Sequence, residues 1–443
     1  MNKLLEVKEF DIITGNPNFE NDEKYKYLDT VAFKNLIEFI HQFTGNEEVA
    51  DALDFMRISY KRNIGNVVSI KNYVGLIQMK NGYQIQILPK ISFTNSDDSE
   101  NINTKKIFLN MLRSMREFPS KVFNDSSIQV DRMNLYEIFI NMYLQEIRRL
   151  IKIGIKSDYI FKEDNLNYYK GKLLTSQHFK TNLVHKERFY ISYDEFNPNR
   201  VENKLIKATL FKLQKLTTSA ENSKEIRQLL VPFEMIDASI NYTTDFSKVK
   251  IDRNNRDYEI IMQWSKVFLL NKSFTTFSGN NNSRALLFSM EKVYESYVAQ
   301  QMKKIFSPDG WKVSAQDRGY FLFQEGHEEK KKNIFRLRPD IVIRRGDVTV
   351  VFDTKWKRLI PDRSKNYGIS SSDMYQMYAY SKKYAEGDMV PEVWVLYPKT
   401  EEMHEPLHFD SGDGTKAHVF FVDVATKDTN LDKLKAMMEA SIK

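Results

Sequence analysis

The stretch IFRLRPDIVIRRGDVTVVFDTKWKRL, residues 334–359, decides how the C-terminal part of this chain folds. Two runs rich in Val, Ile and Phe flank the pair Gly346-Asp347, which is typical of a tight two-residue turn. The stretch is therefore predicted to form a β-hairpin. Because successive side chains of a strand alternate between faces, the turn also predicts which residues share a face.

Counting outward from the turn places Asp340 opposite Asp353, and Lys355 falls on the same face two residues further on. Two carboxylates that face each other across a ladder repel, unless water solvates both or a cation lies between them. The apolar residues around them argue against full solvation. A Mg²⁺ ion held by two carboxylates and several waters suits this arrangement.

Two interpretations of the cluster remain open. Pro339-Asp340 followed by Asp353-Thr354-Lys355 is the residue pattern of the PD-(D/E)xK nucleases. In that interpretation the metal lowers the pKa of a water, and Lys355 positions or deprotonates it or neutralises developing charge. The other interpretation is a hairpin with solvated charges, because P-D and D-x-K each occur often by chance. The hairpin register favours the nuclease interpretation.

Other residues are spaced so that they could join the same site. Residues 283–306 are predicted to form a long helix, on which Glu291 and Glu295 share one face. A carboxylate at Glu295 could reach the metal, although an exposed helix position explains it equally well. Gln376 and Tyr380 lie four apart on the helix after the hairpin and could orient the lysine or a phosphate. A structural role is the alternative for this pair.

Three cations flank the acidic face, namely Arg336, Arg338 and Lys357. They suit a substrate that carries phosphates, such as DNA. A solvated basic patch is the alternative explanation. The whole chain has a mild basic excess, with a formal net charge of +7 and a pI near 9.0, which is compatible with nucleic acid but also with many other partners.

Composition sets the broad class. The 443 residues are 42% hydrophobic and 28% charged, and they contain no cysteine, which excludes disulfides and thiolate metal sites. A signal peptide and a membrane span are not expected, so a cytoplasmic location is predicted. The sequence holds no GxxxxGK[ST] or GxSxG motif. His404 and His408 have the spacing of an HExxH motif, but they fall in a loop-like, Pro-containing segment and not on a helix. A P-loop nucleotide hydrolase, a zinc protease and a serine hydrolase of that type are therefore not expected.

The order of predicted elements indicates an α/β protein, α+β overall, with three domains. Residues 1–125 are expected to form a β-rich domain, residues 126–277 a mainly helical middle domain, and residues 278–443 a mixed α/β domain. The acidic face lies on the central strands of the third domain. Its predicted core is of the PD-(D/E)xK restriction-endonuclease type.

The chain resembles the McrC family, the nuclease subunit of McrBC-type modification-dependent, or type IV, restriction systems. Four stretches carry the resemblance in the expected order across nearly the whole chain: VGLIQMKNGYQIQILPKI, YDEFNPNRVENKLIKATL, RPDIVI with VFDTKWK, and SSSDMYQMYAY. The last two are the more specific, because together they show P-D, D-x-K and then Q-x-x-x-Y. The helix MEKVYESYV is similar to the one that supplies the upstream acid of that nuclease core.

The resemblance implies roles for individual residues. Asp340 and Asp353 would bind Mg²⁺, for which Mn²⁺ could substitute, and Lys355 would be the catalytic lysine. Thr354 stands where many members carry a small residue such as Ala, and its backbone carbonyl would be the further metal ligand. Glu295 would be the acid supplied by the upstream helix, and Gln376 and Tyr380 would be the accessory pair of the catalytic set.

The resemblance also implies a partner and an activity. The family works with a McrB-type AAA+ GTPase hexamer, which reads modified double-stranded DNA and translocates it. The chain would be a Mg²⁺-dependent endonuclease subunit that cleaves methylated DNA, docks through its N-terminal domain and stimulates GTP hydrolysis. Two alternatives stay open. One is an adaptor that mainly stimulates the GTPase and has a weak or structural nuclease core, and the other is a stand-alone repair-type nuclease.

Overall fold

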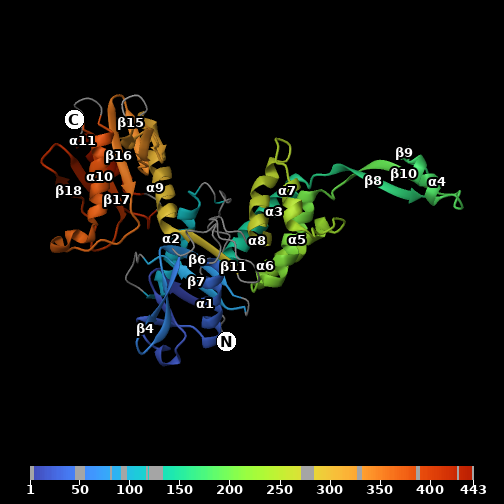
Figure 1. Cartoon of the computed structure of the whole chain (residues 1–443), viewed down its shortest axis with the longest axis horizontal. Helices are drawn as coiled ribbons and strands as arrows, with labels where there is room; N and C mark the ends of the chain where they lie inside the picture. The colour runs from blue at the N-terminus through green and yellow to red at the C-terminus, as the bar shows by residue number, and fades with distance from the viewer. Residues whose placement is uncertain are drawn as a thin grey trace. The chain divides into compact units, whose positions relative to one another are not determined.

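The computed structural model describes residues 4–44, 55–79, 82–90, 97–115, 118, 133–270, 284–326, 332–385, 390–426 and 429–441. It contains two compact units, which are treated separately below (Figure 1). The first combines Met1–Phe118 with Asn281–Lys443, and the second is Pro119–Asn280. Helices and several sheets occur together, so the predicted mixed α/β class is confirmed.

The N-terminal part of the first unit contains two four-stranded sheets. One has the order β1-β7-β6-β11 and the other the order β3-β2-β5-β4. The elements of this part are β1 Leu4–Lys8, β2 Ile12–Thr14, β3 Tyr25–Tyr27, α1 Thr30–Thr44, β4 Met56–Lys61, β5 Gly65–Ile70, β6 Tyr73–Gln78, β7 Gln84–Leu88, α2 Asp97–Leu112 and β11 Arg284–Ser289.

Strand β11 corrects the predicted long helix over residues 283–306. The segment RALLFS pairs antiparallel with β6, and the helix α9 begins only at Met290. The apolar run Leu286–Phe288 is buried, and it completes a sheet edge that β6 would otherwise expose. Pairing with the open edge of β6 therefore outweighs the helical spacing of the apolar residues in this segment. A strand far along the chain thus joins the N-terminal sheet to the C-terminal part of the same unit.

A six-stranded sheet with the order β12-β15-β16-β17-β19-β18 forms the centre of the C-terminal part. Strands β16, β17 and β19 run parallel to one another, and their near-continuous apolar sequences are buried on both faces. The elements are α9 Met290–Phe306, β12 Lys312–Ala315, β13 Phe321–Glu325, β14 Lys332–Arg336, β15 Ile341–Arg345, β16 Val348–Thr354, α10 Ser371–Lys383, β17 Glu392–Pro398, β18 Leu407–Asp410, β19 Lys416–Val422 and α11 Leu431–Ser441.

Helices α9 and α10 cover opposite faces of this sheet. The ring of Phe306 on α9 meets that of Phe352. On the other face, Met377 and Tyr380 of α10 pack with Val351 in one buried cluster. Since Val351 and Phe352 are consecutive strand residues, they point to opposite faces, and so the two helices sandwich β16.

The predicted hairpin register is confirmed. Ile341 pairs with Phe352 and Arg345 pairs with Val348, which leaves Gly346-Asp347 as the two-residue turn. Gly346 has a φ of 59°, a left-handed conformation that glycine adopts without steric cost. The turn thus fixes which residues meet at the far end of the hairpin.

The second unit contains a group of helices and a projecting three-stranded ribbon with the strand order β8-β10-β9 (Figure 1). Long strands β8 and β10 pair along their full length, and β9 and α4 lie with them to form what we call the arm, residues 158–197. The elements are α3 Leu135–Ile153, β8 Asp158–Leu166, β9 Lys172–Leu173, α4 Thr175–Thr181, β10 Phe189–Asn197, α5 Val201–Leu216, α6 Ala220–Leu230, α7 Tyr242–Lys248 and α8 Glu259–Leu270.

Both predicted domain boundaries, at 125/126 and 277/278, lie outside the described residues. The division into three domains therefore stays a prediction. Among the helices that the structure describes, none combines the length and the apolar character needed to cross a membrane.

Candidate active site

The acidic end of the β15–β16 hairpin opens into a pocket of about 850 Å³. Asp340 directly precedes β15, and Asp353 and Thr354 end β16, so both carboxylates and Lys355 line this pocket. The sequence builds this arrangement locally, because the tight turn sets the register and alternation sets the face. The structure thus brings together the two acids and the lysine that the sequence singled out.

Asp340 is held by Thr354. The backbone N–H and the side-chain hydroxyl of Thr354 both donate to Oδ2 of Asp340, at 2.7 and 2.6 Å. Two donors on one oxygen orient the carboxylate and leave its other oxygen for a further ligand. A hydroxyl is therefore useful at this motif position, where the family resemblance implied only a backbone role.

Lys355 is fixed by groups from two elements. Its Nζ lies 2.7 Å from Oδ2 of Asp353 and 3.9 Å from Oδ1 of Asp373, and it donates to Oε1 of Gln376 at 3.2 Å. The amide of Gln376 in turn donates to the hydroxyl of buried Tyr380 at 2.7 Å. Helix α10 therefore supplies a hydrogen-bonded chain that orients the lysine from one side.

The pKa shifts of the two aspartates and the lysine show that a further positive charge would stabilise the charged carboxylates. Burial raises the pKa of Asp340 and of Asp353, and for Asp353 the charge of Asp340 adds to this effect. Burial disfavours the charged form of Lys355, but the charge and hydrogen bond of Asp353 together with the charges of Asp373 and Asp340 outweigh that effect, so the pKa of the lysine is raised. One ammonium therefore does not fully compensate two buried carboxylates.

The donor set fits Mg²⁺. Among the residues that the structure describes, no group of three or more His, Cys, Asp or Glu side chains is arranged to hold a metal. Mg²⁺ commonly needs fewer protein ligands, because it keeps several waters and binds through one or two carboxylates. Asp340 and Asp353 supply two such oxygens, and a bound divalent cation would favour their charged forms and so oppose the burial that raises their pKa values.

The other predicted site residues fall into two groups. Glu295, Gln376, Arg338 and Lys357 line the same pocket as the acids. Glu295 accepts a hydrogen bond from Gln316 at 3.0 Å. Arg336, by contrast, is not among the pocket residues. It lies on β14, in a separate two-stranded sheet, with its guanidinium 4.9 Å from the ring centroid of Phe321. The functional roles of all of these residues stay predictions.

The structure adds residues that sequence reasoning missed. Asp373 lies three positions before Gln376, so the helical spacing on α10 could have indicated it. Asn72 donates a hydrogen bond at 2.8 Å to Glu291, which the sequence had already placed on one helix face with Glu295, and both line the pocket. Glu9, Phe10 and Lys90 come from the N-terminal sheet, and no local pattern could have predicted their arrival here.

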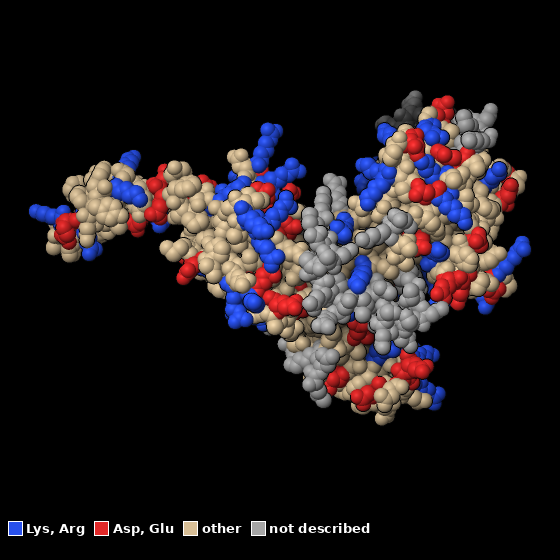
Figure 2. Space-filling view, turned by 180° about the vertical axis from the view of Figure 1, so that it is seen from behind, with Lys and Arg blue, Asp and Glu red and all other residues tan. Residues whose placement is uncertain are grey.

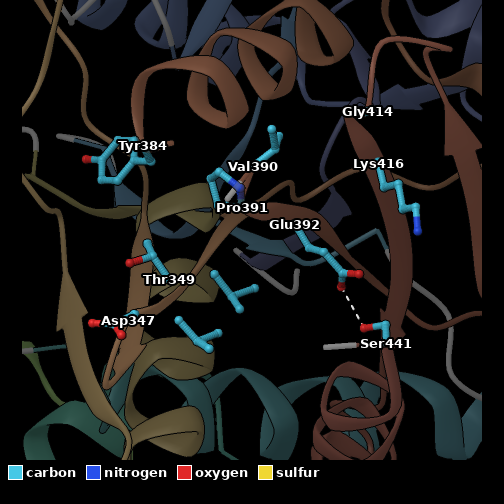
Figure 3. Close-up of a pocket in the computed structure, with 11 residues that line it drawn as sticks. Asp347, Thr349, Tyr384, Val390, Pro391, Glu392, Gly414, Lys416 and Ser441 are labelled. Atoms are coloured by element: carbon cyan, nitrogen blue, oxygen red, sulfur yellow. Dashed lines mark hydrogen bonds between the residues drawn. The ribbon is translucent and has the colours of Figure 1, made fainter. Parts of the chain in front are cut away.

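A smaller pocket of about 270 Å³ lies at the turn end of the same hairpin (Figure 3). Asp347 and Thr349 line one side, and Glu392, which accepts a hydrogen bond from Ser441 at 2.7 Å, lines another. Figure 3 shows Lys416 extending away from these groups. Unlike the larger pocket, this one does not bring an aspartate pair together with a lysine.

Comparisons with known proteins identify the family of the chain. The model of the family described as "McrBC 5-methylcytosine restriction system component" matches residues 68–398, which is most of the chain. No curated protein sequence matches significantly. A solved half-complex of Thermococcus gammatolerans McrB AAA+ hexamers with bound McrC has a chain of the same fold, with a TM-score of 0.70 at 18% identity, covering 99% of this chain and 100% of that one.

A second solved structure, the T. gammatolerans McrBC complex, matches with a TM-score of 0.48 at 18% identity, over 68% of this chain and 87% of that chain. The family match rests on most of the sequence and not on the hairpin motif alone. The chain belongs to the McrC family of McrBC 5-methylcytosine restriction system components.

Proposed function

We propose that the chain is a Mg²⁺-dependent DNA endonuclease subunit with a PD-(D/E)xK core, acting on modified DNA within a restriction complex. The observation that carries the proposal is the meeting of Asp340 and Asp353 in one pocket at the end of the hairpin, with Nζ of Lys355 2.7 Å from Oδ2 of Asp353. Family membership supports the same conclusion, because the matched family is a component of a DNA restriction system.

The residues of the chain divide the work of phosphodiester hydrolysis. Asp340, Asp353 and the carbonyl of Thr354 would hold Mg²⁺, which supplies a water of lowered pKa and stabilises charge on the phosphate. Lys355 carries its charge beside that position and would orient the attacking water or offset the negative charge that develops. Gln376 would keep the lysine in place, and the exposed Arg338 and Lys357 would contact neighbouring phosphates.

The decisive experiment removes one charged group at a time. With Mg²⁺ and the GTPase partner present, Asp353→Ala and Lys355→Ala are each expected to lower DNA cleavage by at least about a hundredfold, because each removes transition-state stabilisation. Asp347→Ala is the matched control, since it removes an exposed carboxylate from the other end of the same hairpin. Cleavage by the Asp353→Ala chain at the unsubstituted rate would show that the site assignment is wrong.

We further propose that the chain assembles with a McrB-like AAA+ GTPase hexamer and stimulates its GTP hydrolysis. The structural relative is McrC bound to McrB AAA+ hexamers. The N-terminal domain is the docking region that the family resemblance implies. The arm supports a second contact, because large apolar side chains stand exposed along it, and contiguous exposed apolar surface commonly marks a protein interface. They are Tyr159, Phe161, Phe179, Leu183, Val184 and Phe196.

Figure 2 shows the arm at the left, covered mostly by residues that carry no charge, with Lys, Arg, Asp and Glu concentrated toward its outer end and its base. Residues 158–197 carry as many Asp and Glu as Lys and Arg, six of each, so the arm has no excess of positive charge to bind a phosphate backbone, and this favours a protein partner over DNA. The proposed division of labour places DNA cleavage in the first unit and one partner contact in the second.

A further inference from the structure

The turn between β1 and β2 projects into the candidate active-site pocket. Phe10 at its tip is 48% exposed and lines the pocket together with Asp340 and Asp353. Its φ is 67°, a left-handed conformation that is rare and unfavourable for a bulky residue. The backbone of Phe10 is strained and its ring is exposed at the edge of the pocket, and this combination points to a role in binding.

Hydrogen bonds hold the strained turn in place. The N–H of Asp11 donates to the carbonyl of Lys8 at 3.1 Å, and the N–H of Lys8 donates back to Oδ2 of Asp11 at 2.8 Å. The N–H of Glu9 donates to the carbonyl of Leu88 at 2.9 Å, which fixes the turn to β7. The backbone therefore has little freedom to relax, and the ring of Phe10 is presented outward.

Glu9 fastens the same turn to the nuclease motif. Its side chain is fully buried, and its Oε2 accepts hydrogen bonds from Nε1 of Trp356 and from the N–H of Lys90, both at 3.1 Å. Trp356 directly follows the predicted catalytic Lys355. The N-terminal sheet and the hairpin end are therefore linked through one carboxylate, and Phe10 keeps a defined place beside the acids.

Lys90 places a positive charge beside the exposed ring of Phe10. Its side chain is exposed, and its Nζ lies 5.4 Å from the centroid of the Phe10 ring. Ring and ammonium together offer a stacking surface next to a positive charge, which is the combination that single-stranded or distorted nucleic acid favours. The pocket has four further exposed cations, which suit a phosphate backbone rather than an apolar protein segment: Lys292, Arg338, Lys357 and Arg358.

From these observations we infer that Phe10 and Lys90 form a nucleotide-contact site in the N-terminal domain, where Phe10 stacks on a base or sugar of the DNA strand and Lys90 binds an adjacent phosphate. The inference rests on the proposed nuclease function and deepens it. The N-terminal sheet then contributes to DNA binding directly, in addition to any role in docking the partner.

Binding measurements on the full chain test the inference without requiring cleavage. Fluorescence anisotropy would follow a labelled duplex and its labelled single strand, with Ca²⁺ replacing Mg²⁺. Phe10→Ala is expected to weaken binding roughly 5- to 100-fold, which is the usual contribution of one aromatic stack. Lys90→Gln is expected to reduce the slope of log Kd against log salt concentration by about one, because it removes one phosphate contact.

Two controls separate binding from folding. Phe10→Gly is expected to keep or raise the thermal unfolding midpoint, because glycine accepts this φ, and yet to weaken DNA binding as Phe10→Ala does. Tyr60→Ala and Lys34→Gln remove an exposed ring and an exposed ammonium from the same domain, neither of which lines the pocket, and should leave binding unchanged.

Several outcomes would overturn the inference. The inference fails if Phe10→Ala binds DNA with unchanged affinity, or if the Tyr60→Ala control loses as much affinity as Phe10→Ala does. It also fails if Phe10→Gly has a lowered unfolding midpoint and normal DNA binding, or if Phe10→Ala loses binding to the GTPase and keeps its DNA affinity. Absence of DNA binding by the unsubstituted chain would likewise overturn it. The nuclease proposal is judged separately. If Asp353→Ala abolishes cleavage while Phe10→Ala binds normally, the nuclease proposal stands and this inference fails.

Discussion

Asp353 is the residue whose environment departs most from that of an ordinary carboxylate at this site. It is 2% exposed, and burial together with the charge of Asp340 raises its pKa. The folded, metal-free chain therefore binds this proton more tightly than the unfolded chain does. The associated stability is present below the ordinary pKa of an aspartate, and it is lost as the pH rises through the raised value.

This gives a prediction about stability and metal. In the absence of metal, Asp353→Asn is expected to stabilise the chain at pH 8 by on the order of 1 kcal/mol, since it removes a buried charge but also loses the pairing with Lys355. At pH 4.5 the effect should be small, because the native carboxyl is then largely protonated. Urea unfolding at the two pH values measures both.

Mg²⁺ provides the control for that experiment. It should raise the unfolding midpoint of the unsubstituted chain at pH 8, because binding to the folded state alone is stabilising, and should do so much less for Asp353→Asn. A variant that Mg²⁺ stabilises as strongly as the unsubstituted chain would show that the ion binds elsewhere.

At the scale of elements, the hairpin and α10 show what could be predicted from the sequence. The pairing of Ile341 with Phe352 follows from a two-residue turn and from alternation, which are both local. The placement of Gln376 near Lys355 follows from helical spacing once the helix lies on the sheet. These contacts involve residues at most a few tens of positions apart, so their geometry depends little on the rest of the chain.

The N-terminal contributions could not be predicted in the same way. Glu9 and Trp356, which share a hydrogen bond, are 347 positions apart in the sequence. Strand β11 has a helical sequence pattern and nevertheless pairs with β6, which completes the sheet that begins at Leu4. Neither contact has a periodic signature, because each is decided by which surfaces remain to be covered when the sheets pack. Arg336 shows the converse, since its closeness in sequence to Arg338 did not bring it into the pocket.

Helix α10 leads to a second prediction. Gln376→Met keeps the length and helical propensity but removes the acceptor for Lys355, so kcat for DNA cleavage is expected to fall about 10- to 100-fold with KM nearly unchanged. Tyr380→Phe removes only the hydroxyl that accepts from Gln376 and should have a smaller effect, of a few-fold. Single-turnover cleavage measures the chemical step in both variants.

The alternative view of α10 is that Gln376 and Tyr380 serve packing alone. In that case Gln376→Met would lower the unfolding midpoint and leave kcat unchanged. Tyr375→Ala, on the same helix with a ring 75% exposed, is the control that should alter neither quantity.

At the scale of the whole molecule, segments distant in sequence build the first unit together. The N-terminal strands β1, β6 and β7 share a sheet with β11, and the pocket takes residues both from the N-terminal strands and turns and from the segment that runs from α9 to α10. Removing residues beyond about 275 would therefore take one strand from the N-terminal sheet and leave the edge of β6 unpaired. Partner binding and nuclease activity are better separated by point substitutions than by truncation.

The arm allows such a separation. Phe179 and Leu183 are 68% and 73% exposed, so their replacement costs little native packing. If the arm contacts the GTPase, burying these side chains contributes roughly 1–2 kcal/mol each, and Phe179→Ser with Leu183→Ser should weaken assembly at least about tenfold. GTPase stimulation and partner-dependent cleavage should fall together, whereas Mg²⁺-induced stabilisation and DNA binding should persist because the first unit is unaltered.

Met235→Ser with Ile240→Ser is the matched control for this last prediction. These side chains are 87% and 96% exposed in the same unit but lie outside the arm, so they test whether any loss of exposed apolar surface weakens assembly. Analytical ultracentrifugation with the GTPase measures assembly, and phosphate release measures stimulation. Equal losses in both double variants, or full assembly of the arm variant, would exclude the arm as a specific contact and leave the N-terminal domain as the docking surface to be tested.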